Sequence, residues 1–294
     1  MPELPEVETM RLQLKKYLTG HIILSVEVKN RRTFQGDENK IIEGKVLDVR
    51  RFGKVSVIDL DNGYSIISHV KLTGQFIYRG PHLPNPGKLS TKVTGGIPGP
   101  HTLVVFRLNG AGVLYYNDVR RFGWIRIEKT EDVEKEKFIV KLGPEPFGSA
   151  QGKPSLLTLD IFKDILSKTS RPIKVVLMDQ EKMGGVGNIY ANDALWLSKI
   201  NPRTPAKNLE GDEVKLLFDA IIKVLKEGIK YGGASELAFV TPDGKEGEYQ
   251  NHTLVYGHEG EPCERPACRQ AGVKIEKFFL GGRGTYFCPF CQKE

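Results

Sequence analysis

The sequence predicts an α+β protein in which an antiparallel β region precedes a helical region and a small metal-binding end. Between residues 22 and 127, short β-branched runs alternate with turn residues, a pattern typical of an antiparallel sandwich or barrel. Beyond residue 146 the apolar residues recur at the spacing of helices. All four cysteines lie within the last 32 of the 294 residues. A chain of this length is expected to form two domains.

The first half of the chain begins with a helix and continues as strands. An apolar stripe predicts a helix over Glu6–Leu18, and Gly20 ends it. Hairpin turns are predicted at Asp61-Asn62-Gly63 and Asn109-Gly110, and Gly80–Pro100 is predicted as a long exposed loop. The predicted strands are Ile22–Val28, Val46–Arg50, Val55–Leu60, Ser65–Leu72, Thr102–Leu108, Val113–Tyr116 and Trp124–Ile127.

The second half is predicted to be helical. The charged run Glu128–Glu136 is interpreted as a solvated connector, and Gly232–Gln250 as a mobile loop. Glycines at 184, 185 and 187 form a turn before a helix, where backbone N–H groups can face phosphate. The predicted helices are Leu156–Leu166, Ile173–Met178, Ile189–Lys199 and Val214–Lys230.

The composition combines ordinary hydrophobicity with an excess of positive charge. Hydrophobic residues make up 39% of the chain and charged residues 27%, and the formal net charge is +7. Such a basic balance favours a polyanionic partner, of which nucleic acid is the usual one. No apolar run approaches the ~18 residues that span a bilayer, and no cleavable signal is recognisable. We therefore expect a cytoplasmic protein with no membrane partner.

The N-terminal segment Met1–Glu6 is the most informative part of the chain. Met1 precedes a small residue, and its removal would leave Pro2 with a free secondary amine. The pKa of an α-amino group is ~7.7–8.0, so a nucleophilic neutral fraction exists near neutral pH. A secondary amine that attacks a carbonyl-level carbon forms an iminium, which is Schiff-base chemistry, and Glu3 can supply or accept the proton. The alternative is a polar leader in which Pro5 starts a helix.

The four cysteines form two close pairs, which is typical of a zinc ribbon. Four thiolates leave no open coordination position, so one structural Zn²⁺ is expected; disulfides are the alternative, which a reducing compartment disfavours. Between the pairs, residues 273–280 and 284–287 are predicted strands, and Arg283 lies in a glycine-rich turn suited to gripping phosphate. The expected ligands are Cys263, Cys268, Cys288 and Cys291.

The chain closely resembles the formamidopyrimidine-DNA glycosylases, bacterial repair enzymes for oxidised purines, from end to end. The motifs that carry the resemblance are Pro2–Thr9, Asn117–Gly123, Leu142–Pro146, Gly187–Ala191, Val255–Gly257, and Gly281–Thr285 with the final cysteine pair. The resemblance implies an N-terminal two-layer antiparallel β-sandwich with an N-terminal helix, then a helix-two-turns-helix domain and a zinc β-hairpin. The expected boundaries are 1–130 for the catalytic sandwich, 131–150 for a linker, 151–250 for the helical domain with a lesion loop, and 251–294 for the zinc hairpin.

The resemblance implies a base-excision repair enzyme that is both a DNA glycosylase and an abasic-site lyase, acting on 8-oxoguanine and formamidopyrimidines. Pro2 would displace the damaged base at the sugar C1′ and form the Schiff base, while Glu3 protonates the sugar ring oxygen. Lys54 would contact phosphate next to the lesion and assist proton transfer. Asn188 and Arg283 would pinch the phosphates around the extruded nucleotide, and Arg283 would assist the second step of the β,δ-elimination.

Extrusion of a base from the duplex costs a few kcal/mol, which apolar wedges in the vacated stack offset. The resemblance places Leu72, Arg120 and Phe122 at the wedge positions. Phe122 could instead be a core strand residue, but two arginines rarely flank a core aromatic. The other residues expected to contact DNA are His101, Arg121, Lys168, Arg171 and Lys174.

The chain departs from the family pattern at four places. Leu72 stands where methionine is usual, and Val119 replaces a proline before the arginines. Gly99 occupies one of two histidine positions, of which His101 is the other. The first cysteine pair encloses four residues in place of the commoner two. None of these departures touches Pro2, Glu3, Lys54 or Arg283.

Alternative functions remain open at this stage. The related endonuclease VIII branch removes oxidised pyrimidines; Leu4, Val7 and the Leu142–Pro146 motif favour the purine branch, whereas Gly232–Gln250 leaves the choice open. A non-catalytic DNA-binding protein on the same scaffold would have lost Pro2 or Glu3. A zinc-ribbon transcription accessory explains the cysteines but not the N-terminus. We expect the partner to be double-stranded DNA with oxidised bases or abasic sites, bound by a monomer.

Overall fold

The computed structural model describes residues 1–147 and 155–293, which form two compact units. Among these residues, unit 1 holds 1–140 and 228–250, and unit 2 holds 141–147, 155–227 and 251–293. The segment 228–250 thus belongs by its contacts to the β-rich unit, although it follows the helices in sequence. The sequence-based division instead placed residues 232–250, the predicted lesion loop, in the helical domain 151–250.

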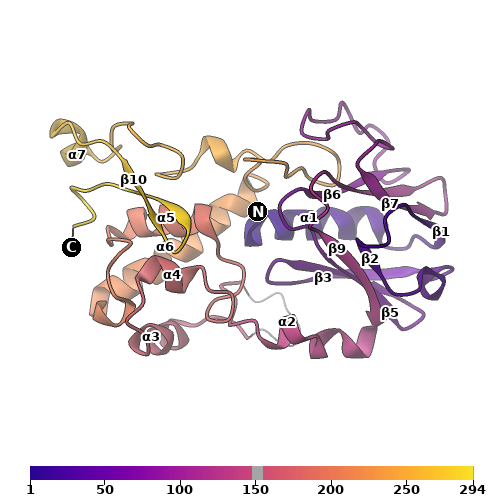
Figure 1. The fold of residues 1–294 in the computed structure, drawn as a ribbon, viewed down its shortest axis with the longest axis horizontal. Helices are drawn as coiled ribbons and strands as arrows, with labels where there is room; N and C mark the ends of the chain where they lie inside the picture. Colours follow the sequence, from indigo (N-terminus) through magenta and orange to yellow (C-terminus); the bar gives the residue numbers. More distant parts are fainter. Residues whose placement is uncertain (148–154, 294) are drawn as a thin grey trace. The chain divides into compact units, whose positions relative to one another are not determined.

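Unit 1 consists of the N-terminal helix α1 (Leu4–Leu18) and two β-sheets (Figure 1). The four-stranded sheet has the order β1 (Ile23–Val28), β7 (Thr102–Leu108), β8 (Val113–Asp118), β6 (Gly74–Arg79). The five-stranded sheet has the order β2 (Phe34–Gln35), β9 (Trp124–Lys129), β5 (Tyr64–His69), β4 (Val55–Leu60), β3 (Val46–Phe52). All neighbouring strands are antiparallel except β2 and β9, which pair in parallel.

One apolar cluster joins α1 to both sheets and forms the core of unit 1. The predicted helical stripe faces it, and Val7 and Leu14 are fully buried there. Ile58 and Ile66 enter the cluster from the five-stranded sheet, and Phe106 enters from the four-stranded sheet. Because removal of apolar surface from water drives folding, this cluster holds the start of α1 firmly against the strands. The predicted α+β class with a two-layer sandwich is confirmed.

Local turn chemistry explains two of the hairpins. Gly63 and Gly110 have φ values of +81° and +64°, which a glycine adopts without strain, and they lie between β4 and β5 and between β7 and β8. β6 was not predicted. Five of its six residues are buried, so its sequence lacks the alternation of apolar and polar residues that marks a half-exposed strand.

Unit 2 contains four main helices and a β-hairpin. Each helix overlaps a predicted one; α3 begins after Thr158, whose hydroxyl accepts the N–H of Ile161 at 3.3 Å as an N-cap. The hairpin pairs β10 (Glu276–Leu280) with β11 (Arg283–Phe287). The helices are α3 (Leu159–Ser167), α4 (Ile173–Leu177), α5 (Asn188–Ser198) and α6 (Gly211–Lys230), whose last residues belong to unit 1.

Short helical turns complete the described chain. The charged run interpreted as a connector contains the 3₁₀ segment η2 (Thr130–Lys135), in which Val133 is buried. No helix among the described residues is long and apolar enough to cross a membrane. The other short segments are η1 (Glu38–Ile41), α2 (Lys137–Val140), η3 (Ala206–Asn208), η4 (Tyr249–Asn251) and α7 (Pro266–Gln270).

Candidate functional site

The first residues of the chain are buried at the start of α1. Pro2 is buried, and the side chain of Glu3 belongs to a residue that is only 3% exposed. The Glu6 carboxylate accepts the backbone N–H of Glu3 at 2.7 Å through one oxygen. Its other oxygen accepts the N–H of Ala234, also at 2.7 Å. Glu6 therefore joins the backbone of Glu3, the predicted acid next to Pro2, to the segment 228–250.

A buried ion pair connects α1 to the turn that carries Lys54. Arg51 on β3 is 2% exposed; its Nε donates to the Glu8 carboxylate at 2.9 Å, and its Nη1 donates to the Gly53 carbonyl at 2.9 Å. Burial alone would raise the pKa of Glu8, but hydrogen bonds and charges from Arg11 and Arg51 outweigh it and hold that pKa below its ordinary value. Arg51 thus joins α1, which follows the predicted catalytic residues Pro2 and Glu3, to the turn that carries Lys54.

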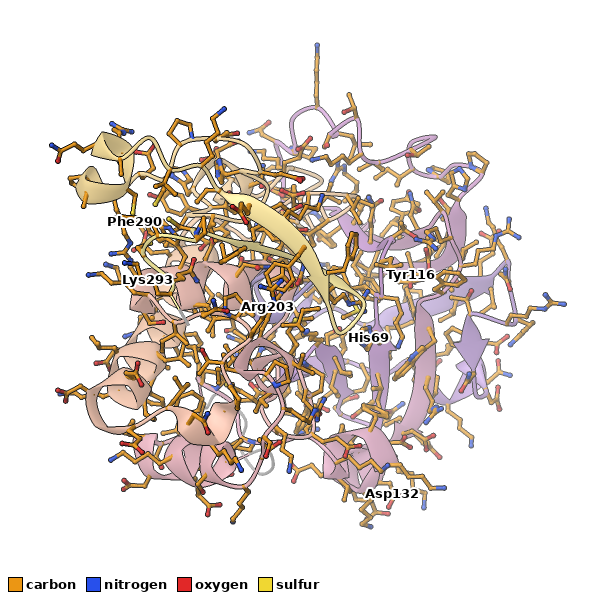
Figure 2. The ribbon with its side chains drawn as sticks, turned by 60° about the vertical axis from the view of Figure 1, so that its left-hand side comes forward. His69, Tyr116, Asp132, Arg203, Phe290 and Lys293 are labelled. Atoms are coloured by element: carbon orange, nitrogen blue, oxygen red, sulfur yellow. The ribbon has the colours of Figure 1, made fainter. Side chains whose placement is uncertain are left out.

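His69 lies at the end of β5 (Figure 2), close enough to Lys71 and Lys54 for their charges to act on it. Its Nδ1 accepts the backbone N–H of Lys71 at 3.0 Å. Burial, together with the charges of Lys71 and Lys54, lowers the pKa of His69 to about 3, so the imidazole is neutral at physiological pH. A neutral ring with an occupied Nδ1 acceptor carries its proton on Nε2. This corner of unit 1 is therefore rich in positive charge and hydrogen-bond donors.

The predicted wedge residues lie on two loops held together by Asp118. The Asp118 carboxylate accepts the Thr73 hydroxyl at 2.5 Å and the backbone N–H groups of Arg120 at 3.2 Å and Gly123 at 2.8 Å. The hydroxyl of Thr73, the residue after Leu72, also accepts the Arg120 N–H at 3.0 Å. The structure thus brings the Leu72 turn beside the Arg120–Phe122 loop.

The aromatic residue predicted to act as a wedge is exposed, unlike a core residue. Phe122 is 55% exposed, and the Arg120 guanidinium lies 4.8 Å from the centre of its ring. Arg121 is exposed with φ of +58°, a conformation that ordinary side chains rarely adopt. His101 is half-buried, and its carbonyl accepts the Asp118 N–H at 3.0 Å. The surroundings of Phe122 do not fit the alternative of a core strand residue.

In unit 2, the predicted phosphate residues lie on α5 and the hairpin. Asn188 is the first residue of α5, and Asn192 one turn later donates to its carbonyl at 2.6 Å. The Asn192 side-chain oxygen accepts the N–H of Tyr286 on β11 at 2.8 Å. Arg283 is exposed at the start of β11. It lines a surface hollow of about 350 Å³ together with Arg171, Val175, Met178, Asp179, Leu280 and Gly281.

Three cations predicted to contact DNA are bound to groups of the protein itself. Lys174 is fully buried, and its ammonium donates to the Gly284 carbonyl at 2.8 Å and the Thr285 hydroxyl at 2.7 Å. It therefore supports the hairpin that carries Arg283. Lys168 pairs with Asp164 at 2.6 Å and Arg171 pairs with Asp179 at 2.7 Å, both on the surface.

The four cysteines are close together at the base of the hairpin. Their sulfur atoms all lie within 4.8 Å of one another, and those of Cys268 and Cys288 are 3.7 Å apart. Four thiolates at about 2.3 Å from a tetrahedral Zn²⁺ would be roughly 3.8 Å apart, whereas a disulfide requires about 2.05 Å. The cluster therefore fits a metal ion and does not contain a disulfide.

The widened knuckle, which is the segment from Cys263 to Cys268, overlaps α7 and contacts α5. Arg265, between the first two cysteines, donates to the carbonyls of Trp196 at 2.7 Å and Leu197 at 3.0 Å. Its guanidinium also lies 4.4 Å from the centre of the Trp196 ring. The guanidinium of Arg203 (Figure 2) lies 3.8 Å from the ring centre of Phe278 on β10. The extra residues of the knuckle thus join the metal cluster to the helix that begins with Asn188.

Two family models match the chain. The formamidopyrimidine-DNA glycosylase N-terminal domain matches residues 1–125, and the formamidopyrimidine-DNA glycosylase H2TH domain matches residues 142–239. The formamidopyrimidine-DNA glycosylase of Lactiplantibacillus plantarum is 35% identical over 100% of both chains, and that of Rickettsia conorii is 38% identical over 99% of both. The chain belongs to the formamidopyrimidine-DNA glycosylase family.

Solved structures of family members share this fold. Lactococcus lactis Fpg, in complex with DNA containing an abasic site, has a TM-score of 0.82 and 32% identity, covering 99% of this chain and 100% of its own. The MutM (Fpg) protein of Thermus thermophilus has a TM-score of 0.82 and 34% identity, covering 99% of this chain and 98% of its own. The resemblance inferred from the sequence motifs is confirmed.

Sequence reasoning missed several residues that organise this family member's site. Glu6 has a local signal, since it stands three residues after Glu3 as in a capping box. His69 stands three residues before the wedge residue Leu72, but its neutrality depends on burial that no local pattern reveals. The ion pair of Glu8 and Arg51 joins residues 43 positions apart, and neither residue differs in sequence from its charged neighbours.

Proposed function

We propose that this protein is a base-excision repair enzyme that removes oxidised purines from duplex DNA and then cleaves the strand. The observation that carries this proposal is the buried start of α1, where Glu6 accepts the backbone N–H of Glu3, next to Pro2. Glu8 of the same helix is bonded through Arg51 to the turn of Lys54. A flexible polar leader would need no such support. The oxidised purines proposed are 8-oxoguanine and formamidopyrimidines.

The proposed chemistry begins after removal of Met1. The Pro2 amine attacks the sugar C1′, the bond to the base breaks, and Glu3 protonates the ring oxygen as the ring opens. The resulting iminium acidifies the neighbouring sugar carbon, so loss of a proton expels the 3′ phosphate and a second elimination expels the 5′ phosphate. Lys54 contacts phosphate and assists proton transfer. Hydrolysis of the iminium returns the free amine.

DNA binding is divided between the two units by role. Leu72, Arg120 and Phe122 fill the space left by the extruded nucleotide, as the exposure of Phe122 supports. Asn188 and Arg283 bind phosphates, and buried Lys174 supports the hairpin that carries Arg283. One structural Zn²⁺, held by the four cysteines, keeps that hairpin folded. The related structures bound to abasic-site DNA and to Fapy-dG DNA support duplex DNA with such lesions as the partner.

The experiment that tests the reaction is borohydride trapping on a duplex with a single 8-oxoguanine. Reduction of the iminium should leave a covalent protein–DNA adduct with the wild-type protein, and Pro2→Gly, which replaces the secondary amine of proline by the primary amine of glycine, should reduce its yield. Pro5→Ala is the matched control because it changes a nearby proline and leaves the amine intact. Peptide mapping that places the reduced cross-link of the wild-type protein on a residue other than Pro2 would assign the nucleophile to that residue.

The second candidate is excision of oxidised pyrimidines. The lesion loop favours neither class of base by its sequence, whereas Leu4, Val7 and the Leu142–Pro146 motif support the purine assignment. Single-turnover excision from matched duplexes carrying 8-oxoguanine or thymine glycol separates the two. Faster excision of thymine glycol would replace the purine assignment and leave the Schiff-base chemistry unchanged.

A further inference from the structure

The segment 228–250 covers the free edge of the four-stranded sheet. β6 is the last strand of that sheet, and its Tyr78 N–H donates to the Pro242 carbonyl at 2.8 Å. Arg79 donates to the Asp243 carbonyl at 3.1 Å. An uncovered strand edge presents unpaired backbone groups, so these contacts give the segment a defined seat on unit 1.

Four polar residues fasten the same segment to the long loop Gly80–Pro100. The Lys92 ammonium donates to the Ser235 carbonyl and, at 2.7 Å, to the Glu246 carboxylate. Ser90 donates to the other Glu246 oxygen at 2.6 Å. Buried Gln75 on β6 donates to the Ala238 carbonyl at 2.5 Å and the Lys92 carbonyl at 2.9 Å. We call Gln75, Ser90, Lys92 and Glu246 the loop clamp.

An apolar cluster lies with the loop clamp. Ile77 of β6, Val93 of the long loop and Val240 of the segment 228–250 are buried together, with Leu89 and Ile97 packed against them. Hydrogen bonds from Lys92 and Ser90 hold the pKa of Glu246 below its ordinary value, so the carboxylate is ionised at neutral pH. The two loops are therefore joined by both apolar packing and charge-assisted hydrogen bonds.

The clamped segment begins beside the predicted catalytic residues. The backbone of Ala234 donates to Glu6, which also accepts from Glu3. Gly233 lies so close that a Cβ built on it would be 2.8 Å from the Glu6 Cγ, and its φ of +85° also favours glycine. In the proposed reaction the Pro2 amine attacks the sugar C1′, and the damaged base is attached to that same carbon. Main-chain groups that follow Gly233 are thus within reach of a base at that position.

We propose that the loop clamp is a positioning device that holds residues 234–246, part of the lesion loop that the family resemblance implies, in a fixed conformation for selection of the damaged base. This inference rests on the proposed function. All four members of the loop clamp are positioning residues. Gln75, Ser90 and Lys92 contact residues 234–246 from outside, and Glu246 is the residue within that segment that Ser90 and Lys92 bind. A fixed loop presents its backbone donors and acceptors without a cost for ordering them on binding, which strengthens discrimination between bases.

The proposal separates two reactions of the same enzyme. Excision requires a base to be recognised, whereas cleavage at a pre-formed abasic site proceeds through the same Pro2 amine with no base present. Loosening the loop clamp should therefore slow excision and leave abasic-site cleavage nearly unchanged. A role in folding alone would lower both rates together.

The test uses the full-length zinc-loaded protein and the variants Lys92→Met and Glu246→Gln. Lys88→Met is the matched control because Lys88 is exposed on the same loop, and Lys92→Arg tests rescue by charge. Loss of a charge-assisted hydrogen bond is expected to slow single-turnover excision of 8-oxoguanine by about tenfold. Abasic-site cleavage should change by less than about twofold, and amide hydrogen exchange in 235–246 should accelerate.

Each outcome decides the proposal. Equal loss of excision and abasic-site cleavage, or unchanged excision in both variants, overturns it. If Lys92→Met does not fold, Glu246→Gln carries the test, because that side chain is 36% exposed and its replacement keeps the shape. If the wild-type protein excised no base, the proposed function would fail. Amide hydrogen exchange would still test the loop clamp, because unchanged protection of residues 235–246 in the variants overturns its role.

Discussion

The start of α1 in unit 1 and the β10–β11 hairpin in unit 2 carry residues of the proposed site on very different supports. Pro2 and Glu3 are buried at one end of a helix whose apolar face enters a core shared with two sheets. Arg283 is exposed on a two-stranded hairpin. A two-stranded hairpin is marginally stable by itself in water, whereas a helix packed on two sheets is not.

The two supports also use charge differently. In unit 1, Arg51 and Glu8 form a buried pair that joins α1 to the Lys54 turn. In unit 2, buried Lys174 donates to neutral oxygens of the hairpin, and the thiolate cluster supplies a metal site at its base. The difference predicts that the proposed chemistry depends on the protein fold alone, whereas the proposed phosphate binding depends on the fold and on the proposed metal.

The largest expected effect concerns the amine. Retention of Met1 converts the Pro2 nitrogen into an amide whose lone pair is delocalised, so base excision and strand cleavage should both fall to background. Unit 1 should remain folded, because the change adds one exposed residue. Intact-mass measurement of the preparation, paired with excision assays, checks this. Full activity in a homogeneous preparation that keeps Met1 would contradict the Pro2 assignment.

Loss of the metal should come next, and it should affect unit 2 alone. Cys268→Ser removes one of four ligands, so bound zinc should fall from one ion per chain towards zero and the hairpin should unfold locally. DNA affinity should then collapse while the sandwich keeps its secondary structure. Metal analysis, DNA titration and hydrogen exchange of unit 1 measure the three effects. Stoichiometric zinc with normal DNA binding would show that the wide knuckle supplies no ligand.

Removal of the buried pair should destabilise unit 1 without affecting the metal. Arg51→Met leaves the Gly53 carbonyl without this donor and the Glu8 carboxylate with only Arg11, so the free energy of unfolding should fall by about 3–5 kcal/mol. Arg31→Met is the control, because Arg31 is exposed where it pairs with Glu38 and loss of a solvent-screened pair should change the free energy of unfolding far less. Equal effects of the two substitutions in denaturant titrations would contradict the assignment of Arg51 as a buried support of unit 1.

Acid should weaken unit 1 in two stages. Burial and the neighbouring charges of Lys71 and Lys54 depress the pKa of His69 from 6.5 to about 3, so unfolding takes up a proton as pH falls below 6.5. Each such proton costs roughly 1.4 kcal/mol of stability per pH unit. Glu8, with a depressed pKa, adds stability above its ordinary value of 4.5 that is lost as pH falls further. Unfolding free energies from pH 8 to 4 should decline accordingly, and His69→Gln should remove the first stage.

The smallest effect separates binding from chemistry. Arg283→Met removes one proposed phosphate contact, so the slope of log affinity against log salt should decrease in magnitude by about one for lesion and undamaged duplex alike. Glu3→Gln keeps the shape of the side chain and removes its transferable proton, so binding should persist while excision stops. An unchanged salt slope in Arg283→Met, or normal excision by Glu3→Gln, would reverse the proposed roles of the two regions.

Much of this architecture follows from local sequence patterns. The stripe of α1, the glycine turns and the paired cysteines each act through neighbours within a few residues, so the helix, two hairpins and the metal cluster were all predictable. β6 was missed because burial removes the alternation that identifies a strand. Lys174 was predicted to contact DNA, and the structure shows it fully buried. The sequence around a lysine does not reveal whether its side chain is buried.

Only the tertiary structure determined which distant groups the charged side chains contact. Glu6 contacts Ala234 across 228 positions, Lys92 contacts Ser235 across 143, and Lys174 contacts Thr285 across 111. The chain contains 43 Lys and Arg and 36 Asp and Glu residues, most of which are equivalent by composition and local pattern. Which of them become buried and paired depends on how distant segments pack, because solvent screens exposed charges and burial strengthens the few that it brings together.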